Sequence, residues 1–481
     1  MIVLKFGGTS VGDRDRVREV ASIIEAQPRP RAAVVSAASG VTNLLLEAAR
    51  AAAAGERDKC AKAVATIRDK HLGIAAGIGD ENERSAALAD LDQLHAALDD
   101  ALAAVAQAGA LSNRDSDRIV STGEKSMSVM MAATLRSRGT EAVHVFANRV
   151  IATDDRFGSA RPDRPRTREQ AAAVVRPLLN AGKTVVMTGF IGGAPDGSTT
   201  TLGRGGSDYS ATLLGAALDA DEVQIWTDVP GVLSADPRKV KDARVVPHIS
   251  YEEAQELAHF GAKVLHPRTI RPAVARNVPV RILSTFAPTA PGTLVTPLAA
   301  GQHLKAVTAM QGLMLLTIDV PELEDFSGAA AVVFRALHED RIEVVLAAQA
   351  SSRRRMTYLI DTVSGGGCAR TRRRIQEALR GFDAEVGCVE DVAVVAAVGH
   401  GAAEQPGYLS RLLTVLERTG TPVLAASQQM SNVALVAAVP ANHADQAVAA
   451  IHAAFIRPQP ASARGRRPRR SELMAESLRV G

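Results

Sequence analysis

Short, uniformly apolar runs alternate with helical segments through the first 300 residues, and this rhythm limits the folds that the chain can adopt. Residues 2–6 and 32–36 have the composition of buried strands, and residues 14–26 between them carry apolar side chains at helical spacing. Strands that are apolar throughout are buried on both faces, as in parallel sheets covered by helices. The sequence therefore predicts an α/β domain over residues 1–300, an open parallel-sheet αβα sandwich. Further strand candidates are residues 142–146, 184–188, 222–227 and 278–282.

A second pattern begins after residue 302 and occurs twice, each time in the order strand, helix, strand, strand, helix. The first copy comprises residues 314–320, 328–339, 342–348, 355–362 and 369–381, and the second comprises residues 392–399, 408–419, 422–427, 432–439 and 444–455. This is the order of elements in ferredoxin-like βαββαβ domains. We expect two such domains, at residues 305–385 and 386–456, and a disordered Arg/Pro-rich tail at residues 457–481.

Composition argues against several classes of protein. Aromatic residues make up only 3% of the chain, and much of the net charge of +4 lies in the tail, so no nucleic-acid surface is indicated. No run of about 18 uncharged apolar residues occurs, so we expect no membrane-spanning segment. Cys60, Cys368 and Cys388 are far apart in the sequence, which indicates neither a disulfide framework nor a zinc site. A reducing, cytoplasmic compartment fits this pattern best.

The end of the first strand carries a glycine pair, in the segment Lys5-Phe6-Gly7-Gly8-Thr9-Ser10-Val11. Two glycines let the backbone approach a ligand closely, and the helix that follows adds a positive dipole end. Lys5 contributes a full positive charge. We interpret the segment as a phosphate cradle, although a plain strand–helix turn with an exposed lysine would have the same pattern.

A second glycine-rich segment, residues 201–210, reads Thr-Leu-Gly-Arg-Gly-Gly-Ser-Asp-Tyr-Ser. Its arginine, Arg204, can grip a carboxylate through two parallel hydrogen bonds. Asp208 lies where a strand gives way to a helix, which is the usual ligand face of an open parallel sheet. A flexible loop with a helix cap at Ser207 or Asp208 is the alternative.

Two further segments extend the candidate site. Residues 226–232 read Trp-Thr-Asp-Val-Pro-Gly-Val, and the polar pair that ends this strand could hold a base or a ribose. Plain turn formation explains the same residues. Residues 260–267 read Phe-Gly-Ala-Lys-Val-Leu-His-Pro, where Lys263 is either a ligand-binding lysine or a surface lysine.

Two common phosphate-binding patterns are missing from the sequence. Pro177 stands where a P-loop ending in Gly182-Lys183-Thr184 would need its first glycine, and neither His-Arg-Asp nor Asp-Phe-Gly occurs. Any phosphate is therefore bound by another scaffold.

In this order and spacing, the four segments resemble the aspartate kinases of the amino acid kinase family. Residues 36–44, 121–124 and 155–158 agree as well, and the duplicated C-terminal unit resembles the paired ACT domains of that family. The resemblance covers residues 1–456. It implies the amino acid kinase fold followed by two ACT domains, and transfer of the γ-phosphate of ATP to the side-chain carboxylate of L-aspartate. The product, 4-phospho-L-aspartate, starts the route to lysine, threonine and methionine.

The resemblance also implies roles for individual residues. Lys5 would neutralise charge on the transferred phosphoryl group, and Asp208 would organise the site. The residues implied to bind aspartate are Ser36, Thr42, Glu124, Phe190, Arg204 and Ser207. The residues implied to bind ATP are Lys5, Phe6, Gly7, Gly8, Thr227, Asp228, Leu233, Arg238 and Lys263. Many relatives carry an aromatic residue where this chain has Leu233, which puts one contact to the base or ribose in doubt.

The chemistry of the acceptor agrees with these residue types. A carboxylate is deprotonated at neutral pH, so its attack on a phosphate needs no general base. Catalysis then depends on alignment and on cancelling the repulsion between two anions. We expect Mg²⁺ to arrive on ATP, because the sequence shows no dense carboxylate cage for a metal.

Three alternatives to this function were open. A kinase of the same fold could act on glutamate or N-acetylglutamate, although such relatives usually lack paired ACT units. A non-catalytic amino-acid sensor would not need the intact set Lys5, Glu124, Arg204 and Asp208. A bifunctional enzyme with a fused homoserine dehydrogenase would extend well beyond Phe455.

Two glutamines suggest the regulatory ligand, since Gln349 and Gln428 follow equivalent strands of the two copies. A side-chain amide offers both a donor and an acceptor, so it can bind a hydroxyl group or an amino-acid backbone. Lysine-sensing relatives often carry an aspartate where this chain has Val345. We expect feedback inhibition by threonine that is stronger than inhibition by lysine alone, and a homo-oligomer assembled through the ACT domains. Simple capping of exposed strand ends is the alternative for both glutamines.

Overall fold

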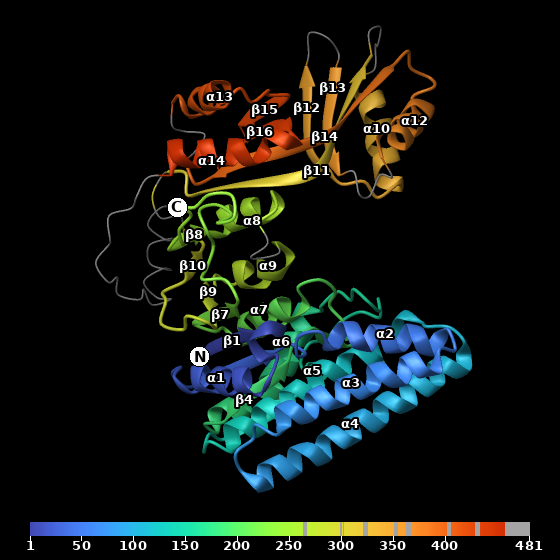
Figure 1. The fold of residues 1–481 in the computed structure, drawn as a ribbon, viewed down its shortest axis with the longest axis vertical. Helices are drawn as coiled ribbons and strands as arrows, with labels where there is room; N and C mark the ends of the chain where they lie inside the picture. The colour runs from blue at the N-terminus through green and yellow to red at the C-terminus, as the bar shows by residue number, and fades with distance from the viewer. Residues whose placement is uncertain are drawn as a thin grey trace.

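The computed structural model describes residues 1–262, 267–298, 301, 303–320, 326–350, 355–361, 367–401, 406–428 and 433–456. Two predicted features, the ligand-binding residue Lys263 and the disordered tail at 457–481, lie outside the described residues. Figure 1 shows an N-terminal part, residues 1–298, below a C-terminal part, residues 303–456. Within the described residues, no helix is both long enough and apolar enough to cross a membrane.

An eight-stranded sheet organises the N-terminal part, in the order β3-β4-β2-β1-β7-β9-β10-β8. The strands are β1 (Ile2–Phe6), β2 (Arg31–Val35), β3 (Ala142–Val145), β4 (Thr184–Thr188), β7 (Glu222–Thr227), β8 (His248–Ser250), β9 (Val280–Ser284) and β10 (Thr293–Thr296). The strands from β3 to β9 are parallel, and β10 runs antiparallel to β9. The predicted parallel strands are confirmed. The sequence did not indicate β8 and β10, because strands of three or four residues show little periodicity.

Helices cover both faces of this sheet, as the predicted αβα sandwich requires. One face carries α1 (Arg14–Glu25), α2 (Val41–Ala53), α3 (Arg57–Ala75), α4 (Glu81–Ala108) and α5 (Asn113–Arg136). The other carries α6 (Arg164–Asn180), α7 (Gly206–Leu218), α8 (Tyr251–His259) and α9 (Pro267–Ala275). A short hairpin, β5 (Ile191–Gly193) and β6 (Thr199–Thr201), lies before α7 in the chain.

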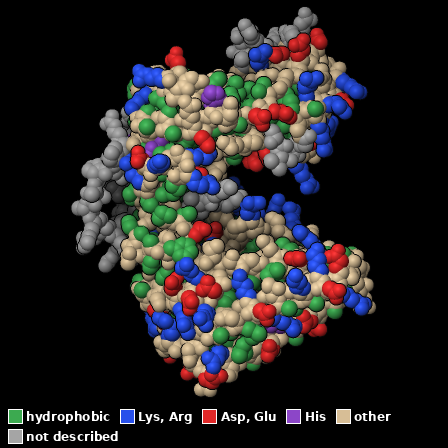
Figure 2. Space-filling model, in the orientation of Figure 1, with side chains coloured by type: hydrophobic (Ala, Val, Ile, Leu, Met, Phe, Trp, Pro, Cys, Tyr) green, Lys and Arg blue, Asp and Glu red, His purple; other side chains and the backbone are tan. Residues whose placement is uncertain are grey.

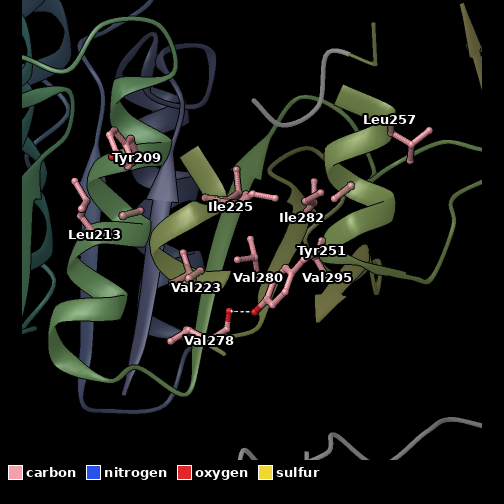
Figure 3. Packing of buried hydrophobic residues seen from close by; sticks show 14 of the residues in the cluster. Tyr209, Leu213, Val223, Ile225, Tyr251, Leu257, Val278, Val280, Ile282 and Val295 are labelled. Carbon is pink, nitrogen blue, oxygen red and sulfur yellow. Dashed lines mark hydrogen bonds between the residues drawn. The ribbon is translucent and has the colours of Figure 1, made fainter. Parts of the chain in front are cut away.

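Side chains of β1 alternate between the two cores. Leu4 and Phe6 pack against the α1–α5 layer, and Val3 packs in the core of the α6–α9 face. Because successive side chains of a strand point to opposite faces, Lys5 is directed to the side of Val3 and α7. Figure 3 shows part of this second core, where the hydroxyl of Tyr251 donates a hydrogen bond to the carbonyl of Val278 at 2.6 Å.

The C-terminal part contains one six-stranded sheet, in the order β12-β13-β11-β14-β16-β15. Its strands are β11 (Ala306–Asp319), β12 (Val344–Ala350), β13 (Arg355–Asp361), β14 (Glu385–Val398), β15 (Ala425–Gln428) and β16 (Ala434–Pro440). Its helices are α10 (Phe326–Glu339), α12 (Cys368–Ala378), α13 (Tyr408–Arg418) and α14 (Ala444–Phe455). The expected order of elements is therefore present in both copies.

The two copies share strands β11 and β14. Residues 306–310 of β11 pair with residues 394–398, beside the second copy, whereas residues 313–319 pair with β13 in the first. Both strands begin earlier than predicted, at 306 instead of 314 and at 385 instead of 392. Polar residues such as Glu385, Glu390 and Asp391 obscure the strand pattern in the early part of β14. This part is nevertheless extended because it pairs with β11. The predicted boundary between residues 385 and 386 falls at the first residue of this shared strand.

A disulfide joins Cys368, at the start of α12, to Cys388 in β14, with the two Cα atoms 6.2 Å apart. The prediction that the cysteines indicate no disulfide is wrong for this pair. The 20-residue separation is spanned by a helix that returns the chain to the neighbouring strand, and sequence spacing does not show this return. Cys60 is a free cysteine. The cysteine pattern consequently no longer supports a reducing compartment.

Candidate active site

Lys5 and Asp208 form an ion pair at the carboxyl end of the central strands, with Lys5 Nζ 2.6 Å from Asp208 Oδ1. Lys5 comes from β1, and Asp208 lies in the first turn of α7. Both side chains are largely buried, at 11% and 19% exposed. Because low-polarity surroundings strengthen charge–charge interactions, the ammonium and the carboxylate hold each other in a fixed geometry.

A cavity of about 550 Å³ surrounds this ion pair. It is lined by Lys5, Gly7, Gly8, Ser36, Thr42, Glu124, Phe190, Arg204, Ser207 and Asp208, among others. The structure thus brings together both residues predicted to be catalytic and all six predicted to bind aspartate. They come from β1, the loop after β2, the start of α2, α5, the turn between β4 and β5, the loop before α7 and the first turn of α7. Figure 2 shows the surface hollowed between the N-terminal and C-terminal parts, with Lys and Arg side chains at the edges of the hollow.

Two glycines are required by the backbone around the cavity. A Cβ atom on Gly8 would lie 2.8 Å from the carbonyl oxygen of Ala37, closer than real side chains approach. Gly205 has a φ of 69°, the left-handed region, at the N-cap of α7. Larger residues at either position would displace a loop that lines the cavity.

Glu124 in α5 is buried, and one of its carboxylate oxygens has no hydrogen-bond partner among the described residues. Burial raises the pKa of Glu124 to about 8, and hydrogen bonding from the Ala37 backbone only partly offsets this effect. Among the described residues, Oε2 of Glu124 has no hydrogen-bond partner. Such an oxygen in a cavity wall suits a ligand that brings a cation or a donor, since an unpaired buried carboxylate is costly.

Arg204 and Phe190 complete the wall around Glu124. Arg204 is exposed at the cavity rim and forms no ion pair within the described part of the chain, so its guanidinium is available to a carboxylate. Phe190 has a φ of 67°, a conformation that is uncommon for a residue with a side chain. Backbone strain of this kind clusters at ligand sites.

Asp117 is a residue of the site region that the sequence analysis missed. Its Oδ2 accepts hydrogen bonds from the amides of Gly158 and Thr201, both at 2.8 Å, and Oδ1 accepts one from the Thr201 hydroxyl at 2.7 Å. Asp117 thereby ties two loops to α5, one of which continues to Arg204. A usable signal existed, because Asp117 precedes Glu124 by seven residues and so lies on the same face of the helix.

The residues predicted to bind ATP are divided between two places. Lys5, Gly7 and Gly8 line the first cavity, whereas Leu233 and Arg238 line a second cavity of about 510 Å³.

The other described residues of this set lie outside the second cavity's lining. Thr227 and Asp228 follow the end of β7, where the Thr227 hydroxyl donates to Asp228 Oδ1 at 3.1 Å. Phe6 is buried and stacks on Trp226, with ring centroids 6.0 Å apart, so its side chain belongs to the core.

Comparison with known proteins agrees with this geometry. The model of the amino acid kinase family matches residues 1–284, and an ACT domain model matches residues 395–455. The chain belongs to the amino acid kinase family. Lysine-sensitive aspartokinase 3 of Escherichia coli (strain K12) is 35% identical over 463 residues, which cover 94% of this chain and 98% of that protein. The aspartokinase of Chlamydia muridarum is 34% identical over 433 residues, 89% of this chain and 91% of that protein.

These relatives place the chain among the aspartokinases, and it is therefore a kinase. The bifunctional aspartokinase/homoserine dehydrogenase 2 of Arabidopsis thaliana is 32% identical, and this chain spans 50% of its length. The crystal structure of E. coli aspartokinase III in complex with aspartate and ADP superposes with a TM-score of 0.78 at 34% identity, covering 95% of this chain and 100% of that one. The lysine and aspartate complex of the same enzyme gives a TM-score of 0.77.

Proposed function

We propose that this kinase transfers the γ-phosphate of ATP, supplied as MgATP, to the side-chain carboxylate of L-aspartate, giving 4-phospho-L-aspartate. The observation that carries the proposal is the single cavity that holds the Lys5–Asp208 ion pair, the unpaired oxygen of buried Glu124 and the available guanidinium of Arg204. The complex of the E. coli relative with aspartate and ADP supports the same pair of ligands.

The two ends of the amino acid find complementary groups in this cavity. An α-ammonium would satisfy the open oxygen of Glu124, and Arg204 would hold a carboxylate in a bidentate contact. The remaining carboxylate of the ligand would then lie toward Lys5. A substrate with one ammonium and two carboxylates thus uses each charged group of the wall.

The chemistry requires alignment of two anions. An oxygen of the substrate carboxylate attacks the γ-phosphorus, the bond to the bridging oxygen breaks, and ADP leaves with that electron pair. No proton has to move, because the carboxylate is deprotonated at neutral pH. Lys5, oriented by Asp208, offsets the negative charge that develops between the acceptor and the phosphate. Backbone amides of the Gly7-Gly8 segment can donate further hydrogen bonds to the phosphate.

The test is a coupled assay of ADP release with L-aspartate, L-glutamate or N-acetylglutamate, with hydroxylamine present to trap an acyl phosphate. We expect ADP and a hydroxamate in equal amounts with L-aspartate. ADP release with glutamate and none with aspartate would show that the acceptor is wrong. ADP release without a hydroxamate would show ATP hydrolysis instead of carboxylate phosphorylation.

We also propose that the chain forms a homo-oligomer through its C-terminal part. The six-stranded sheet ends in β12 on one side and β15 on the other, and edge strands with unpaired backbone groups favour association. Large apolar side chains are exposed in the same part, at Phe334, Val389, Val423 and Leu424.

Threonine is the effector that we propose for this oligomer. Gln349 is exposed on edge strand β12, where it can reach a ligand at an interface, and Val345 of the same strand is buried and offers no charge to a lysine ammonium. Gln428 ends the opposite edge strand, β15. The E. coli relative has been crystallised with lysine, so the comparison of the two amino acids is the decisive measurement. The cytoplasmic location remains a prediction.

A further inference from the structure

Residues 229–239, here named the 229–239 loop, line one side of the second cavity. Helix α14 contacts this loop through two side-chain interactions. Ser234 Oγ lies 2.8 Å from Nε2 of His452 in α14, although 218 residues separate them. Both residues are buried, at 0% and 5% exposed. Lys239 Nζ lies 2.5 Å from Asp445 Oδ1 of the same helix. Figure 1 shows α14 in the C-terminal part, on the side that faces β8 and β10.

Hydrogen bonds fix Ser234 on every side. Its amide donates to the carbonyl of Arg244, and its carbonyl accepts from the amide of Val307, both at 2.8 Å. Its hydroxyl oxygen accepts from the amide of Arg244 at 3.0 Å, which leaves the hydroxyl proton for Nε2 of His452. This arrangement uses a neutral imidazole, in keeping with burial, which lowers the pKa of His452.

Opposite sides of the loop face the cavity and the helix. Leu233 is bridged to Val245 in an antiparallel arrangement, so the chain is extended here and neighbouring side chains point apart. Leu233 lines the cavity, whereas Ser234 contacts α14. A displacement of Ser234 would consequently move Leu233 relative to whatever occupies the cavity.

Three residues on one face of α14 lie against this region. Asp445, Val448 and His452 are spaced by three and four residues, which places them on the same side of a helix. Val448 lines the cavity itself, beside residues 307–311 of β11. Ala235 and Val240 pack in the same apolar cluster as α13, α14 and β16. The 229–239 loop is thus continuous with the N-terminal part in sequence, and its residue Ala235 packs in the core of the C-terminal part.

We infer that α14 positions the nucleotide: His452, and to a lesser degree Asp445, hold the 229–239 loop where Leu233 and Arg238 can contact the nucleoside of ATP. The inference rests on the proposed ATP-binding role of this loop. His452 does not touch the first cavity, where Glu124 and Arg204 lie, so its loss should weaken nucleotide binding and leave aspartate binding unchanged. The C-terminal part then affects ATP affinity even when no effector is bound.

The test compares His452→Ala with wild type in the full chain. MgADP binding is measured by calorimetry, and KM for ATP, KM for aspartate and kcat are measured separately. We expect the dissociation constant of MgADP and the KM for ATP to rise about three- to tenfold, which is the effect of losing one buried hydrogen bond. The KM for aspartate and kcat should stay within about twofold.

Further variants separate positioning from general damage to the helix. Gln446→Ala removes an exposed side chain of α14 that, within the described residues, donates a hydrogen bond to the Thr419 carbonyl of the C-terminal part. This variant should leave MgADP binding unchanged. His452→Gln offers an amide oxygen to the Ser234 hydroxyl and should restore most of the affinity. The double variant Ser234→Ala with His452→Ala should bind MgADP no more weakly than Ser234→Ala alone, because Ser234→Ala already removes the hydrogen bond to His452. If His452→Ala fails to fold by circular dichroism, Ser234→Ala decides the question.

Three results would overturn the inference. The first is unchanged MgADP affinity in folded His452→Ala or Ser234→Ala. The second is a rise in the KM for aspartate as large as the rise in the KM for ATP. The third is a loss of MgADP affinity in Gln446→Ala as large as the loss in His452→Ala. The MgADP titration needs no acceptor, so wild type that binds MgADP without phosphorylating aspartate refutes the proposed function and leaves this test intact. Wild type that fails to bind MgADP refutes both.

Discussion

The ammonium of Lys305, the residue before β11, lies 2.7 Å from Oε2 of Glu253 in α8, and both side chains are almost completely buried, at 3% and 1% exposed. The other oxygen of Glu253 accepts the amide of His400, just after β14, at 2.7 Å. The same carboxylate also caps α8 through the amide of Ser250. One glutamate thus connects the N-terminal part to the strand that enters the C-terminal sheet and to the strand that leaves its centre.

Replacing Lys305 by methionine should destabilise the chain strongly, because the buried Glu253 carboxyl group would lose its ion-pair partner. Removing one partner of a buried pair typically costs about 3–5 kcal/mol. The matched control is Lys59→Met, whose exposed pair with Glu56 contributes about 1 kcal/mol or less. Chemical denaturation of both variants is the measurement. Equal stability of the two would contradict a structural role for the buried pair.

Lys5→Ala and Asp208→Ala should each lower kcat by about 100- to 1000-fold, the usual effect of removing one preorganised charge from a transition state. The fold should survive, since each change shortens a side chain at a cavity wall. Steady-state rates with circular dichroism on the same samples provide the check, with Lys59→Ala as a surface control. Near-normal turnover in Lys5→Ala would remove it from the proposed mechanism.

Aspartate binding should strengthen as the pH rises from about 6.5 to 8.5. Glu124 has a pKa of about 8 when no ligand is bound, so below that pH it must lose a proton before it can pair with an ammonium. The KM for aspartate should fall by up to about tenfold per pH unit below pH 8 and then level off.

The matched comparison is Glu124→Gln, which should raise the KM for aspartate and flatten its pH dependence. Calorimetry in two buffers of different ionisation enthalpy should detect the released proton in wild type only. A KM for aspartate that does not vary with pH in wild type would show that Glu124 is already ionised in the free enzyme.

A buried histidine pair in the helical layer should make the fold sensitive to acid. His71 Nδ1 lies 2.9 Å from His95 Nε2, and burial, followed by the charge of His95, lowers the pKa of His71 to about 3. The unfolded chain binds this proton near pH 6.5, so between about pH 6.5 and 3 it binds more protons than the folded chain. Stability is complete above pH 6.5 and should fall by about 1.4 kcal/mol per pH unit below it.

Melting temperatures of wild type and His71→Gln between pH 4.5 and 7.5 measure this effect. The variant should have a lower melting temperature than wild type at pH 7.5, but its melting temperature should fall less steeply than that of wild type as the pH decreases. Parallel curves for the two proteins would mean that other groups cause the acid sensitivity.

Threonine should inhibit the enzyme more strongly than lysine, and Gln349→Ala should weaken that inhibition about tenfold with basal kcat within about twofold. Effector binding at a distance acts by favouring one of two enzyme states, so the response can be lost without the activity. Inhibition curves for both amino acids, with the exposed α12 variant Gln376→Ala as control, decide the matter. Strong lysine inhibition with no effect of threonine would overturn the proposed effector.

The amino-acid pattern alone predicted the parallel strands of the N-terminal sheet and the two glycine-rich segments of the candidate site. Apolar runs such as residues 2–6 specify buried parallel strands, and such strands carry ligand residues at their carboxyl ends. Lys5 and Asp208 each stand at such a junction between strand and helix, and the resemblance to the aspartate kinases implied that both belong to one site. The glycines that flank them are likewise local requirements of the backbone.

The tertiary structure was needed to show which residues far apart in the sequence meet. Asp117 with Thr201, Ser234 with His452 and Lys305 with Glu253 are all pairs whose partners lie in different elements, and no spacing rule connects them. The early half of β11 is a strand because it pairs with the late half of β14, and the early half of β14 is a strand because it pairs with the late half of β11. Cys368 meets Cys388 because α12 returns the chain to β14. These contacts depend on packing between elements, and that packing is decided when the whole chain folds and not by the order of nearby residues.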